Sequence, residues 1–168
     1  IRVAETVARI YPPKEGTPGI SVFGEELKSL IGSPIQIQLD QETLDRVSGE
    51  EEGQTYDQVV AKVDGYLEQQ GQKLLMREQF VVPSNLDGEF GSISFIGSVH
   101  VKGDVLAGFL VTGEKGIVVN GNVNRTELRS LTGPIEIKGR FFGEGRGKLI
   151  SEKSITVRSI QDGIIDAV

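Results

Sequence analysis

The sequence has no cysteine, and this absence excludes several classes of protein at once. Disulfide scaffolds, iron–sulfur clusters, zinc sites with cysteine ligands and thiol catalysis all need the missing side chain. Tryptophan is also absent, aromatic residues make up only 6% of the chain, and His100 is the single histidine. No apolar run approaches the length of about 18 residues that a membrane-spanning helix needs. We therefore expect no direct membrane insertion.

The chain is acidic, with a formal net charge of −6, but its charge is unevenly divided. Residues 1–92 carry 8 Lys+Arg against 16 Asp+Glu, whereas residues 93–168 carry 10 against 8. A nucleic-acid-binding protein needs a concentrated cationic face, because binding is driven by the release of counterions from phosphates. Neither part of the chain has the charge for such a face. We therefore expect no nucleic-acid partner, and we expect two regions of different character.

Glycine is abundant, at 22 of 168 residues, and it recurs at one position of a repeat. The repeat has the pattern apolar-x-apolar-x-Gly-x-apolar, and its three full copies begin at Val99, Ile117 and Ile135, 18 residues apart. A degenerate fourth copy begins 20 residues later, at Ile155. The residues that define the repeat are Val99, Val101, Gly103, Val105, Ile117, Val119, Gly121, Val123, Ile135, Ile137, Gly139, Phe141, Ile155 and Val157.

This repeat predicts a parallel β-helix over residues 86–168. Apolar and polar residues alternate within each copy, which indicates β-strands, and the glycine allows a corner. Eighteen residues divide into three faces of about six, so each copy forms one rung that stacks on the next at the ~4.8 Å strand spacing. Val101, Val119 and Ile137 then occupy one inward column. The alternative is a β-hairpin whose two-residue turn is Asn120-Gly121, a dipeptide that favours such turns.

Residues 1–85 have a different β-rich pattern. Strands are expected near residues 3–10 and 34–39, and residues 59–67 and 73–82 are expected to form a hairpin. The acidic segment 40–57 is interpreted as a solvated loop in which a short helix at residues 41–47 is possible. Proline and glycine interrupt the apolar pattern at residues 83–91, where we place the boundary. The predicted fold class is therefore all-β, with a smaller β-rich domain before a parallel β-helix.

Three features invite a chemical interpretation, but none has the full pattern. The glycine-rich segment 143–148 has Phe142 and Leu149 where a phosphate-binding loop needs glycine and Ser or Thr, so it is interpreted as an enlarged corner of one rung. His100 could be the base of an acyltransferase, but it alternates with inward valines and is expected to be solvated. The acidic run at residues 50–52 lacks the ligand spacing of a calcium loop. We predict no catalytic residue, no cofactor and no metal site.

The outward positions of the repeat carry mixed polar and charged side chains, which form a possible interaction surface. A homodimer could use this face, or it could use the apolar end at residues 164–168, unless the last residues cover the unpaired strand groups there. The residues of the predicted surface are His100, Lys102, Asn120, Glu136 and Lys138.

Four segments resemble, in order, the signatures of the bacterial flagellar assembly protein A family. They are residues 8–24, 61–66, 101–109 and 121–123, and residues 143–149 resemble that family's glycine-rich segment. The resemblance implies a cytoplasmic bacterial protein in which a β-rich domain leads into a right-handed parallel β-helix, similar to the C-terminal domain of the division inhibitor MinC. Members of the family are usually longer, so it also implies that this chain is a core fragment. It implies no catalytic residues.

The resulting functional hypothesis is a non-enzymatic scaffold or adaptor in flagellar assembly or polar placement, acting on protein partners through the faces and ends of the β-helix. The alternative is a β-helix enzyme that acts on an acyl or polysaccharide substrate. An enzyme is expected to gather perturbed titratable groups in a cleft, whereas a scaffold is expected to present flat faces.

Overall fold

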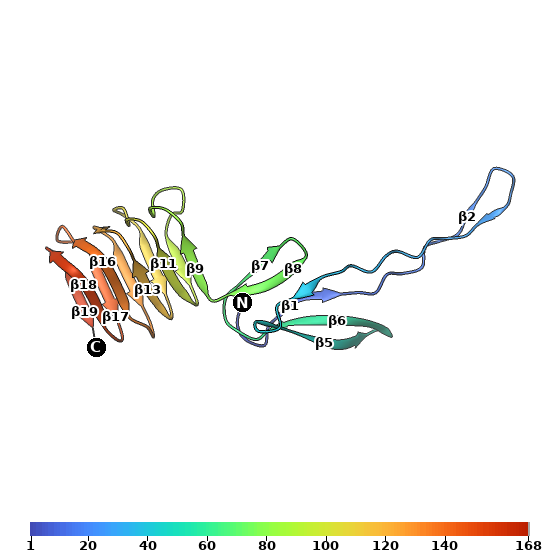
Figure 1. Cartoon of the computed structure of the whole chain (residues 1–168), viewed down its shortest axis with the longest axis horizontal. Helices are drawn as coiled ribbons and strands as arrows, with labels where there is room; N and C mark the ends of the chain where they lie inside the picture. Colours follow the sequence, from blue (N-terminus) through green and yellow to red (C-terminus); the bar gives the residue numbers. More distant parts are fainter. Residues whose placement is uncertain (168) are drawn as a thin grey trace. The chain divides into compact units, whose positions relative to one another are not determined.

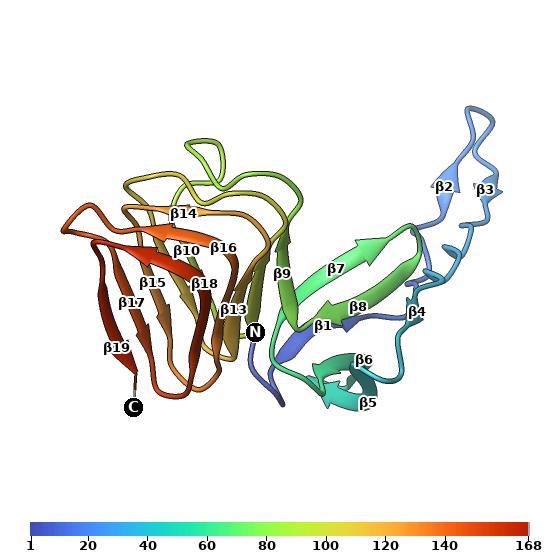
Figure 2. The same cartoon turned by 60° about the vertical axis from the view of Figure 1, so that its left-hand side comes forward.

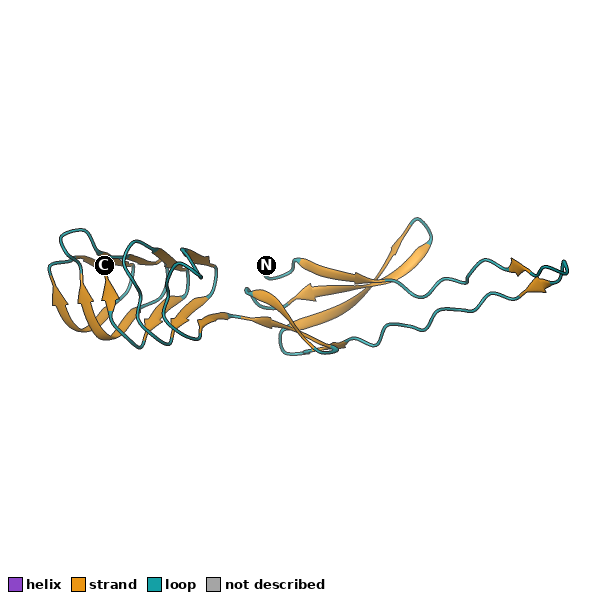
Figure 3. Cartoon of the chain, turned by 90° about the horizontal axis from the view of Figure 1, so that it is seen from above, coloured by secondary structure: helices purple, strands orange, loops and turns teal. Residues whose placement is uncertain are grey.

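The computed structural model describes residues 1–167, which form two compact units. The first unit is Ile1–Met76 and the second begins at Arg77 (Figure 1). The described residues form β-strands joined by turns and loops, and none of them is helical (Figure 3). This confirms the predicted all-β fold class.

The second unit is a parallel β-solenoid, whose strands stack rung on rung along two long faces (Figure 2). A third, shorter face has isolated bridges that join Leu86, Val105 and Val123, continued by β14 (Val123–Asn124). The strands of the first face, in stacking order, are β9 (Gln79–Val82), β11 (Ser98–Val101), β13 (Gly116–Val119), β16 (Ile135–Phe142) and β18 (Ile155–Gln161). Those of the second face are β10 (Ile93–Phe95), β12 (Leu110–Gly113), β15 (Glu127–Ser130), β17 (Lys148–Ser151) and β19 (Ile164–Ala167).

The 18-residue period sets the register of the first face. Val101 pairs with Val119, and Val119 pairs with Ile137. These three side chains are buried in one apolar core cluster, as their shared phase predicts. The hairpin interpretation of Asn120-Gly121 is wrong, because β13 and β14 both pair in parallel with β16. The chain turns a corner between two faces at this dipeptide.

The first unit is built from two small sheets and a projecting arm. One sheet has the order β1 (Thr6–Ile10), β6 (Gln54–Ala61) and β5 (Leu44–Glu51), with antiparallel pairing. The other has the order β4 (Gln38–Leu39), β8 (Lys73–Arg77) and β7 (Tyr66–Gln70). Their shared core contains Leu44, Val59, Ala61, Leu74 and Met76.

The acidic segment 40–57 differs from its prediction, because most of it is strand rather than solvated loop. β5 and β6 form a hairpin around Glu52-Gly53, whose φ angles of 52° and 76° are both positive. Two positive φ angles give the twist that a two-residue hairpin turn needs. No helix forms at residues 41–47, since a turn there leads directly into β5.

The division between the units falls between Met76 and Arg77, whereas the sequence pattern placed it in residues 83–91. The stretch 73–82 contains two strands, and β8 belongs to the first unit except for its last residue, Arg77. β9 pairs in parallel with β11 and is therefore the first strand of the solenoid. At the other end β19 is exposed over its whole length, and Val168, the last residue of the predicted apolar end, lies outside the described residues.

Candidate interaction surfaces

The first candidate surface is the outer side of the sheet formed by β9, β11, β13, β16 and β18, here called the coil face. Its central column of outward positions runs in register from one rung to the next. The inward column of Val101, Val119 and Ile137 is here called the core column. Each of its residues is followed directly by an exposed one, namely Lys102, Asn120 and Lys138. The central column consists of Val81, His100, Val118, Glu136 and Thr156.

His100 differs from its prediction as a solvated side chain. It has the expected outward position, but it is only partly exposed, and its Nε2 atom is buried without a hydrogen-bond partner. Its register neighbours on the adjacent rungs are Val81 and Val118. The sequence contained this signal, because two outward valines at the rung spacing indicate an apolar strip beside the histidine.

A ladder of side-chain oxygens fixes one corner of the solenoid, next to the repeat glycines. Asn85 Oδ1 accepts a hydrogen bond from the backbone N–H of Asp104 at 2.8 Å. Asp104 Oδ1 accepts from the N–H of Asn122 at 2.6 Å, and Asn122 Oδ1 accepts from the N–H of Arg140 at 3.0 Å. Each side chain therefore bonds to the next rung. The repeat pattern predicts the glycines at this corner, but the ladder beside them was not predicted.

Substitution of Asp104 tests the ladder. We expect Asp104→Ala to lower the free energy of unfolding by about 1–2 kcal/mol, because a backbone N–H at a partly buried corner loses its acceptor. Asp104→Asn keeps the Oδ1 acceptor and is expected to unfold close to the wild type. Urea unfolding of the three proteins measures both effects. Equal destabilisation by alanine and asparagine would contradict the ladder as a source of stability.

The glycine-rich segment 143–147 is an enlarged corner, as predicted. Phe142 and Lys148 are six positions apart, whereas their partners in the preceding rung, Asn124 and Glu127, are three apart. The amides of residues 143, 145, 146 and 147 all donate to backbone carbonyls within the second unit. They are therefore not directed at an anion, in contrast to the amides of a phosphate-binding loop.

The second candidate surface is the arm of the first unit, which comprises residues 11–37. Two extended segments run out to a short hairpin made of β2 (Gly19–Ile20) and β3 (Glu26–Leu27) (Figure 3). A strand was expected only at the end of this segment, near residues 34–39, and the exposure of its apolar side chains was not predicted. Val22 is 96% exposed and Phe23 87%. The large apolar residues exposed on the arm are Tyr11, Ile20, Val22, Phe23, Leu27, Leu30, Ile31 and Ile35.

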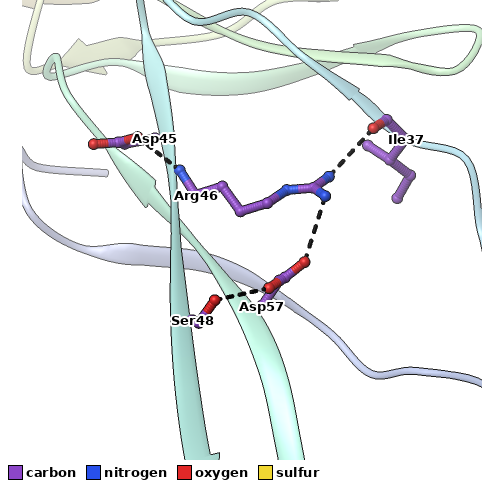
Figure 4. A network of polar contacts seen from close by, with 5 residues as sticks. All are labelled: Ile37, Asp45, Arg46, Ser48 and Asp57. Atoms are coloured by element: carbon purple, nitrogen blue, oxygen red, sulfur yellow. Dashed lines mark hydrogen bonds and ion pairs between the residues drawn. The ribbon is translucent and has the colours of Figure 1, made fainter.

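The base of the arm is held to the β5–β6 hairpin by a polar network (Figure 4). Arg46 Nη2 donates to the carbonyl of Ile37 at 3.4 Å, and Arg46 Nη1 lies 3.4 Å from Asp57 Oδ2. Ser48 Oγ donates to the other oxygen of the same carboxylate at 3.4 Å. The returning segment of the arm is therefore tied to the first sheet of its unit.

A groove of about 420 Å³ lies beside this network. Tyr11 and Tyr56 contact each other there, with ring centroids 5.4 Å apart, and the Arg9 guanidinium lies 4.9 Å from the Tyr56 ring centre. A side-chain hydrogen bond to Tyr11, together with Coulombic interactions with Tyr56 and Glu51, raises the pKa of Arg9. The apolar lining residues of the groove are Ile10, Tyr11, Pro12, Pro13, Pro34, Ile35 and Tyr56.

Within residues 1–167, no group of three or more histidine, aspartate or glutamate side chains is arranged to hold a metal ion. In the same part of the chain, no helix has the length and apolar character of a membrane span.

The stacked parallel rungs and their repeat define a β-solenoid protein. Comparison with family models agrees with this class. The β-solenoid domain of flagellar assembly protein A matches residues 78–168, and the N-terminal region of the same protein matches residues 1–72. The chain therefore belongs to the flagellar assembly protein A family, which supports a role associated with flagellar assembly. Searches of curated proteins and of solved structures gave no match.

Proposed function

We propose that this protein is a non-enzymatic scaffold for flagellar assembly or polar placement in the bacterial cytoplasm, and that a protein partner binds its coil face. The observation that carries the proposal is the composition of that face. Its centre contains Val81, His100 and Val118, and Lys102 and Lys138 are exposed beside it. An apolar centre with a polar rim is typical of protein interfaces. The exposed lysines favour a partner with acidic side chains.

The coil face also supports a scaffold through its rigidity. Each of its strands is hydrogen-bonded to the strand of the next rung, and its inward side chains belong to a single core cluster. A surface held in this way loses little conformational freedom when a partner binds, which lowers the cost of association.

The acyltransferase form of the competing enzyme hypothesis depended on His100. A general base must come within hydrogen-bond distance of the proton that it removes. The Nε2 atom of His100 is buried beneath the surface, so a substrate reaches it only if the neighbouring side chains move. The geometry therefore favours a packing role for this histidine in the centre of the face.

Charge reversal in the host bacterium tests the proposal. A Lys102→Glu/Lys138→Glu variant of the full-length protein is expected to reduce the number of flagella to that of the deletion strain, because it reverses the charge beside the apolar centre. Both side chains are exposed, so the amount of folded protein should not change. Electron microscopy of cells and immunoblotting measure the two quantities.

The matched control is Lys148→Glu/Lys153→Glu, which makes the same charge change at two exposed lysines outside the coil face. This control is expected to assemble flagella normally. Normal flagella with the Lys102/Lys138 variant, or equal loss with the control, would contradict a partner site on the coil face.

A further inference from the structure

The arm of the first unit leaves a large apolar surface in water. Its two segments run side by side, with Gly16 close to Leu30 and Gly32 close to Pro13. An isolated two-stranded ribbon buries little apolar surface and is at best marginally stable in water. The arm nevertheless carries eight large apolar side chains that are exposed in the single chain. Many exposed apolar side chains on so short a segment indicate an interaction site.

One arm carries both a projection and a recess. The projection is its tip, where Val22 and Phe23 stand almost fully exposed. The recess is the groove of about 420 Å³ at its base, lined by Tyr11, Pro12, Pro13, Pro34, Ile35 and Tyr56 among others. Its volume falls within the range of about 300–1,000 Å³ that is usual for apolar ligand pockets. The tip cannot reach the base of its own arm, because Phe23 and Pro13 lie at opposite ends of the paired segments.

We propose that two copies of this chain associate through antiparallel arms, with the Val22–Phe23 tip of each arm in the Tyr/Pro groove of the other copy. Contact of tip with base in one direction implies the same contact in the other, so the pair closes with two-fold symmetry. The inference concerns the first unit and does not depend on the scaffold function proposed for the coil face.

The arm carries little net charge. The tip carries Glu25 and Glu26, and the groove is lined by Arg46 together with Asp57, with which Arg46 is paired at 3.4 Å. Residues 11–37 carry two lysines and three glutamates, so two copies of the arm meet with little net repulsion.

The available surface is also large enough. Stable complexes bury about 800 Å² on each partner. Eight large apolar side chains at roughly 100 Å² each supply this area.

A lipid surface is a poorer occupant of the arm than a second copy of the chain. Residues 1–92 carry twice as many acidic as basic side chains, and anionic headgroups repel them.

Disulfide cross-linking tests the proposed contact directly, because the chain has no cysteine of its own. Phe23→Cys and Ile35→Cys proteins, carrying tags of different mass, are mixed and mildly oxidised. Covalent heterodimers are expected to predominate over either homodimer. A disulfide needs Cα atoms within about 7 Å. Phe23 and Ile35 lie 12 residues apart, at the tip and at the base of one extended segment, so the bond forms between chains.

Sedimentation equilibrium supplies the second measurement. Phe23→Ser is expected to raise the dimer dissociation constant roughly 30-fold or more, as truncation of a central aromatic anchor does. The control Leu131→Ser removes an exposed leucine from the solenoid and is expected to leave the constant unchanged. Circular dichroism verifies that both variants are folded.

Several results would overturn the inference. They are a strict monomer at high micromolar concentration, a dimer that Phe23→Ser does not weaken, and homodimers of Phe23→Cys that form as readily as heterodimers, which would indicate tip-to-tip contact. A monomer that binds phosphatidylcholine vesicles through Phe23 would assign the arm to lipid and would also overturn it.

Discussion

Replacing Val119 with aspartate is expected to unfold the second unit. Val119 is 0% exposed and lies between Val101 and Ile137 in the core column. An aspartate there has an apolar residue on the rung above and on the rung below. Burial of a charge without a partner costs several kcal/mol, which is a large part of the 5–15 kcal/mol that usually stabilises a domain. Far-ultraviolet circular dichroism and urea unfolding are expected to show the loss of the cooperative transition of the solenoid.

Two companion variants separate burial of charge from loss of volume. Val119→Ala removes methyl groups and leaves a cavity, so a smaller loss of about 1–3 kcal/mol is expected. Val81→Asp places the same carboxylate on the outer side of the same sheet, where the valine is 38% exposed, and a change below about 1 kcal/mol is expected. If Val119→Asp unfolds at the same urea concentration as Val81→Asp, the column is not the core of the coil.

The solenoid could be predicted from the sequence because the period of its repeat equals the number of residues in one rung, and this number sets which residues pair on neighbouring rungs. Residues 18 positions apart, such as Val101 and Val119, become neighbours on stacked rungs. The apolar pattern at that spacing therefore carries both the strand assignment and the pairing. Such a signal does not depend on the loops between the strands, and the enlarged corner at residues 143–147 did not hide it.

The first unit was harder to predict because buried and exposed side chains hardly alternate along a strand such as β5. β5 contains only one buried residue, Leu44, and its remaining side chains are exposed or partly exposed. A strand that packs on one sheet through so few side chains looks like a solvated acidic loop in sequence. Its hairpin depends on the backbone conformation of Glu52-Gly53, and Glu-Gly is a weaker turn signal than Asn-Gly.

The candidate sites show the same contrast between periodic and isolated features. The outward positions of Glu136 and Lys138 followed from the phase of the repeat, and both are exposed. The burial of His100 depends on valines one rung away, which matter only once the register is known. The arm has no period at all. Its apolar residues could be counted in the sequence, but their exposure follows from the absence of any strand of the described chain packed against them.

Gly139→Ala is expected to destabilise the second unit by about 2–3 kcal/mol. A Cβ atom at Gly139 would lie 2.3 Å from the carbonyl oxygen of Gly121 and 2.6 Å from its carbonyl carbon. Both are backbone atoms of the preceding rung, so they cannot move aside as the end of a flexible side chain can. Introducing atoms into a well-packed site usually costs about 1–3 kcal/mol. The φ angle of Gly139 is not positive, which makes the expected cost steric rather than conformational.

Gly88→Ala is the matched control for this prediction. A Cβ atom at Gly88 would meet no atom within 4 Å, and the φ angle there is not positive. This substitution is expected to leave the unit unchanged or to stabilise it by up to about 1 kcal/mol, because alanine restricts the unfolded chain more than glycine does. Urea unfolding of both variants and the wild type measures the difference. If the two variants unfold alike, the glycine of the repeat is not required by the close approach of neighbouring rungs, and its recurrence every 18 residues needs another physical cause.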